Sequence, residues 1–397
     1  MKPVAADPKT AAEPSADGRV LRVVGGARDI GEAVWAKLAA GAEAEGDPFA
    51  DYAFLAALEA SGSVGEGSGW EPAFLGLDVD GTLTAAATAY AKTHSQGEYV
   101  FDHHWADAYM RAGGRYYPKL TVAAPFTPAT GPRLLGATPQ DRRALAAGLA
   151  GFAEQVGFSS VHVNFLTESD AATLQDVGFL SRLGVQYHWF NRGYADYDAF
   201  LATFASRKRK QIKRERREAH ASGVTIRRLV GDAIEPRHWD AFWRFYQDTG
   251  ARKWGTPYLT RAFFDDIART AGDRMLMVVA ERDREPVAGA LNFIGADALY
   301  GRYWGCSEQA RFLHFEVCYH QAIEFAIERG LSRVEAGAQG EHKIARGYEP
   351  VATRSAHWIV EPSFREAIAR YLDNEREQVR REIDFLAAET PFKKETE

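Results

Sequence analysis

The sequence has little of several features that would assign a protein to a class at once. Its 397 residues include two cysteines, Cys306 and Cys318, which excludes a disulfide framework and a four-cysteine zinc site. So few cysteines are typical of a reducing compartment, and we expect a cytoplasmic protein. There is no apolar run of ~18 residues and no apolar N-terminal segment of the signal-peptide kind. We therefore predict neither a membrane span nor export by that route.

What is present indicates a folded protein of more than one domain. Hydrophobic residues make up 46% of the chain and aromatic residues 12%, which is enough apolar material for buried cores. At ~150 residues per domain, the length predicts two domains. Residues 1–18 are rich in Ala, Pro, Asp and Ser, and we expect a flexible tail there.

The two halves of the chain repeat one order of predicted elements. The pattern is a hairpin, a strand, a helix, a strand, a helical segment and a strand. In the first half it covers 73–93, 115–126, 139–157, 159–166, 169–179 and 183–194. In the second half it covers 275–296, 298–306, 314–330, 332–339, 341–349 and 355–361. We interpret this as a duplication of a mixed α/β (α+β) unit, with an insertion of about thirty residues around 101–114 in the first copy.

A strongly basic segment lies between the two copies. Residues 207–217, RKRKQIKRERR, carry eight basic side chains and one acidic one, a local charge of +7 that leaves -13 on the rest of a chain whose net charge is -6. The spacing predicts a helix that ends at Gly223. The segment is either a solvated linker or a surface for phosphate-bearing partners, with Arg207, Lys208, Arg209 and Lys213 as candidate anion-binding residues.

Several runs resemble one known family. They are YYPKLTVAAPFTPATGPRLL (116–135), YWGCSEQARFLHFEVCYHQAIEFAI (303–327), EAGAQGEHKIARGYEP (335–350) and SAHWI (355–359). Together they look like the FemAB-like predicted N-acyltransferases of the GNAT superfamily, a family associated with peptidoglycan biosynthesis or recognition. The resemblance implies two tandem GNAT-like folds, each a mixed, largely antiparallel sheet flanked by helices. The expected divisions are 19–198, a linker helix at 199–223, and 224–397 with a C-terminal helix.

The resemblance also implies a reaction. We expect an N-acyltransferase or aminoacyltransferase that forms an amide bond on a small-molecule amine acceptor, without a tightly bound cofactor. Acyl-CoA users of this superfamily resemble Q/R-x-x-G-x-G/A at the strand-to-helix junction, whereas residues 309–313 contain no glycine. This departure favours aminoacyl-tRNA as the donor and leaves acyl-CoA open. The alternative is a non-catalytic, degenerate GNAT pair that binds an envelope precursor or RNA.

The densest polar cluster follows the strand that contains Glu335. Strand alternation predicts that Glu335 faces the open side, and the candidate bases are Glu335, Glu341 and Glu316. His342 is a further candidate catalytic residue, which would position an anionic group. Lys343 and Arg346 lie one helical turn apart and would form a two-pronged cation for a phosphate or carboxylate. The candidate substrate-binding residues are Gln339, Lys343, Arg346, Tyr117, Lys119, Lys253, Trp254, His188 and Tyr303. Four of these form two pairs of a cation and a ring on which a ligand could stack, Tyr117 with Lys119 and Lys253 with Trp254.

Other catalytic classes find no support in the spacing. His314 with Glu316, and His103 with His104, match no zinc motif, so we predict no metal site. The nucleophile motif G-x-S-x-G of serine hydrolases does not occur.

Overall fold

The computed structural model describes residues 18–42, 44, 46–253, 257–308, 310–338 and 340–393, without the side chains of 251–253. Four predictions fall outside it: the tail at residues 1–17, Gln339, Trp254 and the side chain of Lys253. No helix in the described ranges is both long and apolar enough to cross a membrane.

The chain forms two compact units, and each takes residues from both halves of the sequence. Unit 1 contains the described residues up to Gly184 together with Thr353–Arg380. Unit 2 contains Val185–Ala352 together with the described residues from Arg381 onward.

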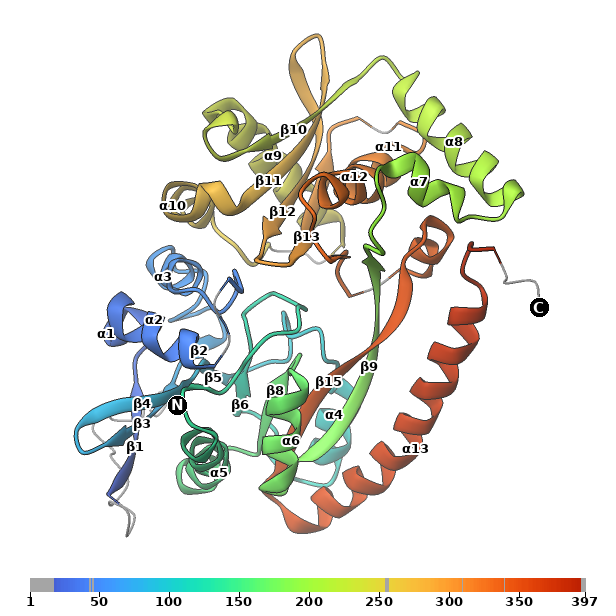
Figure 1. Cartoon of the computed structure of the whole chain (residues 1–397). Helices are drawn as coiled ribbons and strands as arrows, with labels where there is room; N and C mark the ends of the chain where they lie inside the picture. The colour runs from blue at the N-terminus through green and yellow to red at the C-terminus, as the bar shows by residue number, and fades with distance from the viewer. Residues whose placement is uncertain are drawn as a thin grey trace. The chain divides into compact units, whose positions relative to one another are not determined.

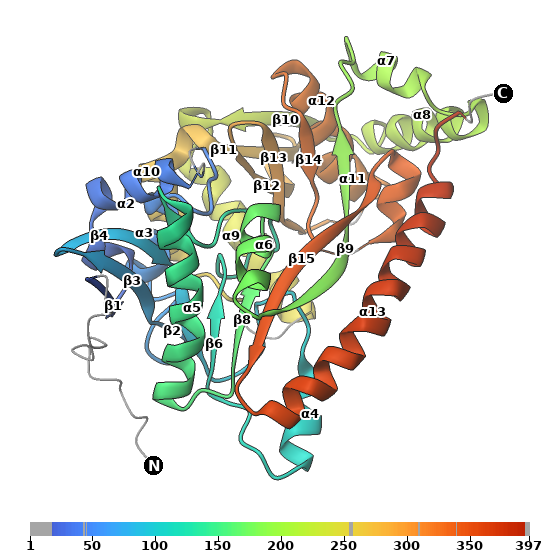
Figure 2. The same ribbon diagram turned by 60° about the horizontal axis from the view of Figure 1, so that its bottom comes forward.

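Unit 1 contains two sheets. The smaller has the strand order β1-β3-β4-β7, and the other joins β2, β5, β6, β8 and the end of β15, with β6 and β8 parallel. The strands are β1 (Arg19–Val24), β2 (Trp70–Pro72), β3 (Phe74–Val79), β4 (Thr82–Ala87), β5 (Ala89–Lys92), β6 (Lys119–Val122), β7 (Leu135–Gly136) and β8 (Ser160–Asn164). The helices are α1 (Ala27–Ile30), α2 (Glu32–Gly41), α3 (Tyr52–Ala60), α4 (His103–Arg111), α5 (Pro139–Val156), α6 (Glu168–Asp176) and the larger part of α13 (Pro362–Ala388). Helix α5 packs against β3, β4 and β8, as Figure 2 shows.

Unit 2 contains one sheet of order β10-β11-β12-β13-β14-β9, in which β13 and β14 are parallel. Its strands are the end of β9 (Leu180–Phe190), β10 (Thr225–Val230), β11 (Met275–Arg282), β12 (Glu285–Ile294), β13 (Ala298–Cys306), β14 (Arg333–Glu335) and the start of β15 (Glu349–Ile359). Its helices include α7 (Tyr197–Ala202), α8 (Ser206–His220), α9 (Pro236–Lys253), α10 (Arg261–Ala271), α11 (Leu313–Phe315) and α12 (Gln321–Glu328). Short helical turns are η1 (Gly231–Ala233), η2 (Gly272–Arg274), the π-helical η3 (Glu316–His320) and the 3-10 helix η4 (Glu341–Arg346). Helix α9 packs against β12 and β13 (Figure 1).

The two copies of the repeat exchange their last strands. By sequence β9 is the last strand of the first copy, yet residues 188–190 pair with β14 of unit 2. Strand β15 contains the last strand of the second copy, yet residues 355–359 pair with β8 of unit 1. The compact units are therefore discontinuous in sequence, whereas the expected divisions at 198 and 224 refer to the repeat and remain a prediction.

Local sequence signals explain the elements that frame both sheets. Asp80–Gly81 and Asp283–Arg284 are two-residue turns with positive φ at both positions, the geometry that suits the twist of a hairpin. Helix α5 begins after Thr138, whose side chain accepts a hydrogen bond from the backbone of Asp141, and ends at the left-handed Gly157. Both predicted hairpins and the predicted helix are confirmed.

Other predicted elements are shorter or interrupted. The strand expected at 332–339 ends at Glu335, and the strand expected at 115–126 is reduced to β6. The linker helix expected at 199–223 is divided into α7 and α8 by a segment in which Phe204 is fully buried and bridges to Phe392, whereas the basic residues 207–217 all lie in α8. In each case tertiary packing overrides the local pattern.

Candidate functional site

The turn predicted to carry the chemistry is well formed in unit 2. Strand β14 leads through Gly337 and Gly340, both with positive φ, into the 3-10 helix η4. Glu341 and His342 are exposed at its start. The Nε2 atom of His342 lies 2.9 Å from the hydroxyl of Tyr319. We call residues 341–346 the η4 turn.

The prediction that Glu335 faces the open side is wrong. Glu335 is only 4% exposed, and its Oε1 accepts a hydrogen bond of 2.9 Å from Nε of Arg333. Strand β14 lies between β13 and β9 in the sheet, and this position encloses the side chain. Nε2 of His188, on β9, lies 3.7 Å from Oε2 of Glu335. Burial lowers the pKa of His188 to about 3, so that this imidazole is neutral.

The two cations of the η4 turn point into the protein. Nζ of Lys343 donates to the carbonyl of Gly337 at 3.0 Å, and burial lowers the pKa of this lysine to about 7. Arg346 pairs with Glu215 of α8 at 2.8 Å, and its guanidinium lies 3.4 Å from the ring centroid of Phe315. The predicted two-pronged cation is therefore engaged in internal contacts and does not face solvent.

Glu316 occupies the π-helical turn and is completely buried. Arg216 of α8 forms two hydrogen bonds with its carboxylate, at 2.9 and 2.8 Å. Gln321 and His220 reach Oε1 of the same carboxylate at 2.7 and 3.2 Å. Burial alone would raise the pKa of Glu316, but the hydrogen bonds and charge of Arg216 hold this pKa below its ordinary value. Glu316 is therefore ionised at neutral pH.

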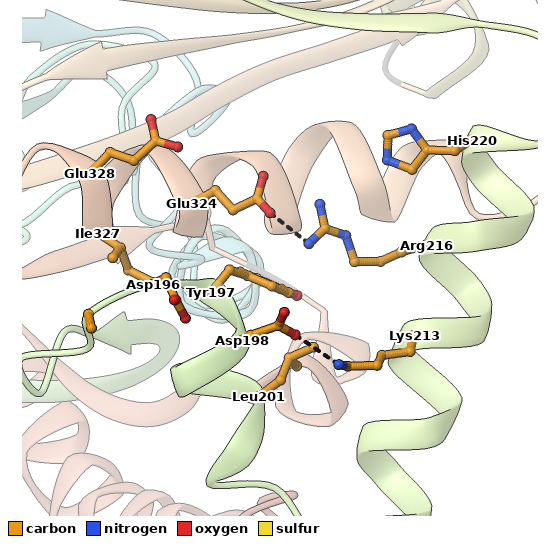
Figure 3. A pocket seen from close by; sticks show the side chains of 11 residues that line it. Asp196, Tyr197, Asp198, Leu201, Lys213, Arg216, His220, Glu324, Ile327 and Glu328 are labelled. Atoms are coloured by element: carbon orange, nitrogen blue, oxygen red, sulfur yellow. Dashed lines mark hydrogen bonds and ion pairs between the residues drawn. The ribbon is translucent and has the colours of Figure 1, made fainter.

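A cleft of about 650 Å³ opens beside this carboxylate, between α7, α8 and α12 (Figure 3). It is lined by Ala195, Asp196, Tyr197, Asp198, Leu201, Lys213, Arg216, His220, Glu324, Ile327 and Glu328. Lys213 pairs with Asp198 and Arg216 with Glu324, each at 2.8 Å. We call this the α8–α12 cleft.

Helix α8 has two chemically different faces. Ile212, Glu215 and Ala219 are buried. The outward side chains include Arg207, Lys208, Lys210 and Arg217, and none of them forms an ion pair within the described part of the chain. Of the other candidate anion-binding residues, Arg209 is half-buried and Lys213 pairs with Asp198.

Tyr117 and Lys119 belong to a separate cluster in unit 1. Lys119 is completely buried, and its Nζ lies 2.9 Å from Glu98, 2.5 Å from Asp102 and 2.9 Å from Oγ of Ser95. The hydroxyl of Tyr117 lies 2.8 Å from the same Ser95 oxygen. Lys119 is thus the cation of a buried ion cluster, not an exposed cation that could stack on a ligand.

The network around Lys119 extends across the sheet of unit 1. Tyr116 donates to Asp102 at 2.6 Å and lies 3.3 Å from Nε2 of His162. The Nδ1 atoms of His162 and His357 are 2.8 Å apart. Burial lowers the pKa of His162 to about 3, so that its ring takes part as a neutral group.

The remaining predictions concern an aromatic residue and metals. Tyr303 packs against Tyr246, with ring centroids 5.2 Å apart, in the aromatic cluster formed by α9 and α10. Among the described residues, no group of three or more His, Cys, Asp or Glu side chains is arranged to hold a metal ion.

Comparison with known proteins identifies the family of the chain. The model of the FemAB-like family, described as peptidoglycan biosynthesis/recognition, matches residues 26–394. The chain belongs to the FemAB-like family. No curated protein matches it.

Solved structures that resemble this FemAB-like protein are distant in sequence. The structure of L-PGS from Bacillus licheniformis has a TM-score of 0.50 and 13% identity. The alignment covers 83% of this chain and 98% of the L-PGS chain. FemX has a TM-score of 0.47 and 12% identity, with 76% and 91% covered. A tandem GNAT protein from the clavulanic acid biosynthesis pathway has a TM-score of 0.44 and 11% identity, with 87% and 99% covered. The predicted mixed α/β fold is confirmed by the mixed sheets and their helices, and at 13% identity the likeness to L-PGS concerns the fold alone.

Sequence reasoning missed several residues of the FemAB-like protein that lie at these clusters. Arg216 and His220 were inside the predicted basic helix, but their contact with Glu316 joins positions about a hundred residues apart. Glu98 and Asp102 lie at the start of the insertion of the first copy, and only the fold brings them to Lys119. The one available signal was the i, i+4 spacing of Arg216 and His220, which places both on one face of a helix.

Proposed function

We propose that this FemAB-like protein transfers an acyl or aminoacyl group from an activated donor to an amine and thereby forms an amide bond. The family description extends the proposal to an acceptor that is a cell-wall precursor. A cytoplasmic location agrees with it, because activated acyl donors are made there. The reaction needs a positioned amine, a group that removes its proton and a surface that holds the donor.

The observation that carries the proposal is the division of α8 into two faces. The inner face is tied to the candidate site, because Glu215 pairs with Arg346 of the η4 turn and Arg216 pairs with Glu316. The outer face carries cations that no described side chain neutralises. A polyanion bound on this face would lie one helix diameter, ~10 Å, from the groups on the inner face.

This arrangement supports aminoacyl-tRNA as the donor more than acyl-CoA. A row of solvated cations matches a phosphate backbone, and its contribution to binding is electrostatic. At the β13-to-helix junction the residue before the helix is Phe312, in left-handed conformation. A glycine would allow a pyrophosphate to approach the backbone more closely than this side chain does.

Burial of three candidate residues favours a second function. Glu335, Lys343 and Arg346 are held by internal partners, as expected for a protein that retains the fold of the enzyme but has lost catalytic activity. A binding module that recognises an envelope precursor or RNA is therefore the alternative. It would bind tRNA as the enzyme does but form no product.

Binding across a salt series tests the donor, and product analysis tests the reaction. We expect total tRNA to bind with a steep loss of affinity as salt increases. Replacing Lys208, Lys210 and Arg217 with Gln should reduce the slope of log K against log salt by about 2–3, at 0.7–0.9 per cation removed. The control replaces Arg143 and Arg370, both exposed in unit 1, and should leave the slope unchanged.

The two functions separate when aminoacylated tRNA is incubated with a panel of amines, including cell-wall precursors, and the products are analysed by mass spectrometry. A new amide product supports the transferase. Salt-dependent tRNA binding without any product supports the binding module. Salt-independent or absent binding would exclude a role for α8 in holding the donor.

A further inference from the structure

A histidine and a carboxylate form a hydrogen-bonded pair at the edge of the α8–α12 cleft. Nε2 of His220 lies 3.2 Å from Oε1 of Glu316. The Glu316 side chain is fully buried, whereas that of His220 is 49% exposed and lines the cleft. Figure 3 shows the imidazole on α8 beside Arg216. One member of the pair is thus shielded from water and the other can meet a ligand.

The contacts of Glu316 define which nitrogen of His220 carries the proton. Because Arg216 keeps Glu316 ionised, its Oε1 can only accept a hydrogen bond, and Nε2 of His220 must donate it. A neutral imidazole then has a free electron pair on Nδ1. Within the described chain Nδ1 makes no hydrogen bond, and it is available to take a proton from a group in the cleft.

The rest of the cleft suits an organic cation with an aliphatic body. Four of its lining side chains are carboxylates, Asp196, Asp198, Glu324 and Glu328, against the two lining cations Lys213 and Arg216. Arg228, outside the lining, pairs with Glu328 at 2.8 Å, so that Asp196 is the lining carboxylate without a cationic partner among the described side chains. This excess of negative charge attracts an ammonium group.

The floor and the size of the cleft match the same ligand. Leu201, Ile327 and the ring of Tyr197 are at least nine-tenths buried and supply apolar surface for a chain of methylene groups. The volume of about 650 Å³ lies within the ~300–1,000 Å³ of small-molecule sites.

We infer that the α8–α12 cleft binds a primary aliphatic amine as its ammonium ion, and that Nδ1 of His220 removes a proton from it. Glu316 is a positioning residue that orients the imidazole and stabilises its protonated form. This inference rests on the proposed function, for which it supplies the amine site. The η4 turn, whose cations are engaged internally, has no part in the proton transfer.

When His220 is neutral, the ammonium group gives one proton to Nδ1, and the amine nitrogen then attacks the carbonyl carbon of the donor ester or thioester. The new C–N bond forms, and the C–O or C–S bond breaks, with its electron pair leaving on oxygen or sulfur. The leaving oxygen or sulfur takes the proton that Nδ1 holds. His220, neutral again, then takes the second proton lost by the nitrogen and releases it to water.

The first test measures the amine site without any donor. Protein with ¹⁵N-labelled histidine is titrated with n-pentylamine, and with 1-pentanol as the uncharged control. We expect the His220 signals to report the Nε2–H tautomer, to shift saturably with pentylamine and to remain in place with pentanol. Glu324→Gln should weaken pentylamine binding at least threefold, whereas Glu366→Gln, on an exposed part of α13, should not.

The second test separates chemistry from folding. His220→Gln keeps a donor for Glu316 but has no basic nitrogen, and we expect it to bind pentylamine while transfer falls ~10²–10⁴-fold. Glu316→Gln should abolish the tautomer preference of His220. An Nδ1–H tautomer, no pentylamine shift at His220, or full transfer by His220→Gln would each overturn the inference. Saturable pentylamine binding with no transfer from any donor would instead reject the proposed function and leave the amine site in place.

Discussion

Removing the buried cation of unit 1 should be one of the most damaging single changes in the chain. Lys119 is the ion-pair partner of Glu98 and Asp102, and the side chains of the two acids are each 1% exposed. Lys119→Met keeps the length of the side chain and leaves both carboxylates buried without a cation. Breaking a buried ion pair in this way costs about 3–5 kcal/mol. At 2–4 °C per kcal/mol for a unit of this size, the melting temperature should fall by roughly 6–20 °C.

The pH dependence gives this prediction a second, independent readout. Burial raises the pKa of Asp102, but Lys119 outweighs it, so that the pKa in the folded protein lies well below the ordinary value. The stability supplied by this pair is therefore present above the unfolded pKa of ~3.9 and is lost as the pH falls further. In Lys119→Met both acids can bind protons at low pH. The stability difference between wild type and variant should be largest near pH 7 and should shrink toward pH 4.

Urea unfolding at both pH values, followed by hydrogen exchange of peptides from β5 and β6, measures the effect. Lys37→Met, at an exposed position of α2, is the matched control and should change stability by less than ~0.5 kcal/mol. A variant that also carries Glu98→Gln and Asp102→Asn should regain most of the loss, because it leaves no unpaired charge. A loss below ~1 kcal/mol in Lys119→Met, or no recovery in the triple variant, would refute the reasoning.

Three further predictions concern the buried Lys343 and two glycines, Gly151 and Gly305. Burial lowers the pKa of Lys343 to about 7, so between pH 7 and ~10.4 the unfolded chain binds a proton that the folded chain does not. Stability should therefore rise with pH in this window, by up to ~1.4 kcal/mol per unit, in wild type relative to Lys343→Met. Urea denaturation that gives the same stability difference between wild type and Lys343→Met at pH 7, 8 and 9 would contradict this prediction. Gly151→Ala, in an open position of α5, should stabilise by ~0.5–1 kcal/mol in thermal unfolding. Gly305→Ala should destabilise by ~1–3 kcal/mol, because its Cβ would lie 2.5 Å from the backbone oxygen of Phe245. The opposite order of these two melting temperatures would show that the packing has been misjudged.

The location of the candidate site could be predicted from the sequence better than the roles of its residues. The turn after Glu335 was expected from a strand end followed by glycines and charges, and η4 lies there. Its cations were expected to hold a phosphate or carboxylate together, but Lys343 and Arg346 turn inward because Gly337 and Glu215 supply their partners. Glu316 was expected to act as a base, and the structure instead surrounds it with donors from Arg216, Gln321 and His220. A residue type in a motif does not reveal which distant side chain will neutralise it.

The sequence by itself determined what depends on neighbours along the chain. The hairpin turn at Asp80–Gly81 and the capped helix α5 follow from local propensity and hydrogen bonding. Tertiary structure alone decided the exchange of β9 and β15 between the two copies of the repeat, since a strand carries no local mark of the edge to which it will pair. It also decided the ion cluster of Lys119 and the pairing of His220 with Glu316, because both join residues whose separation along the chain makes their contact a property of the whole fold.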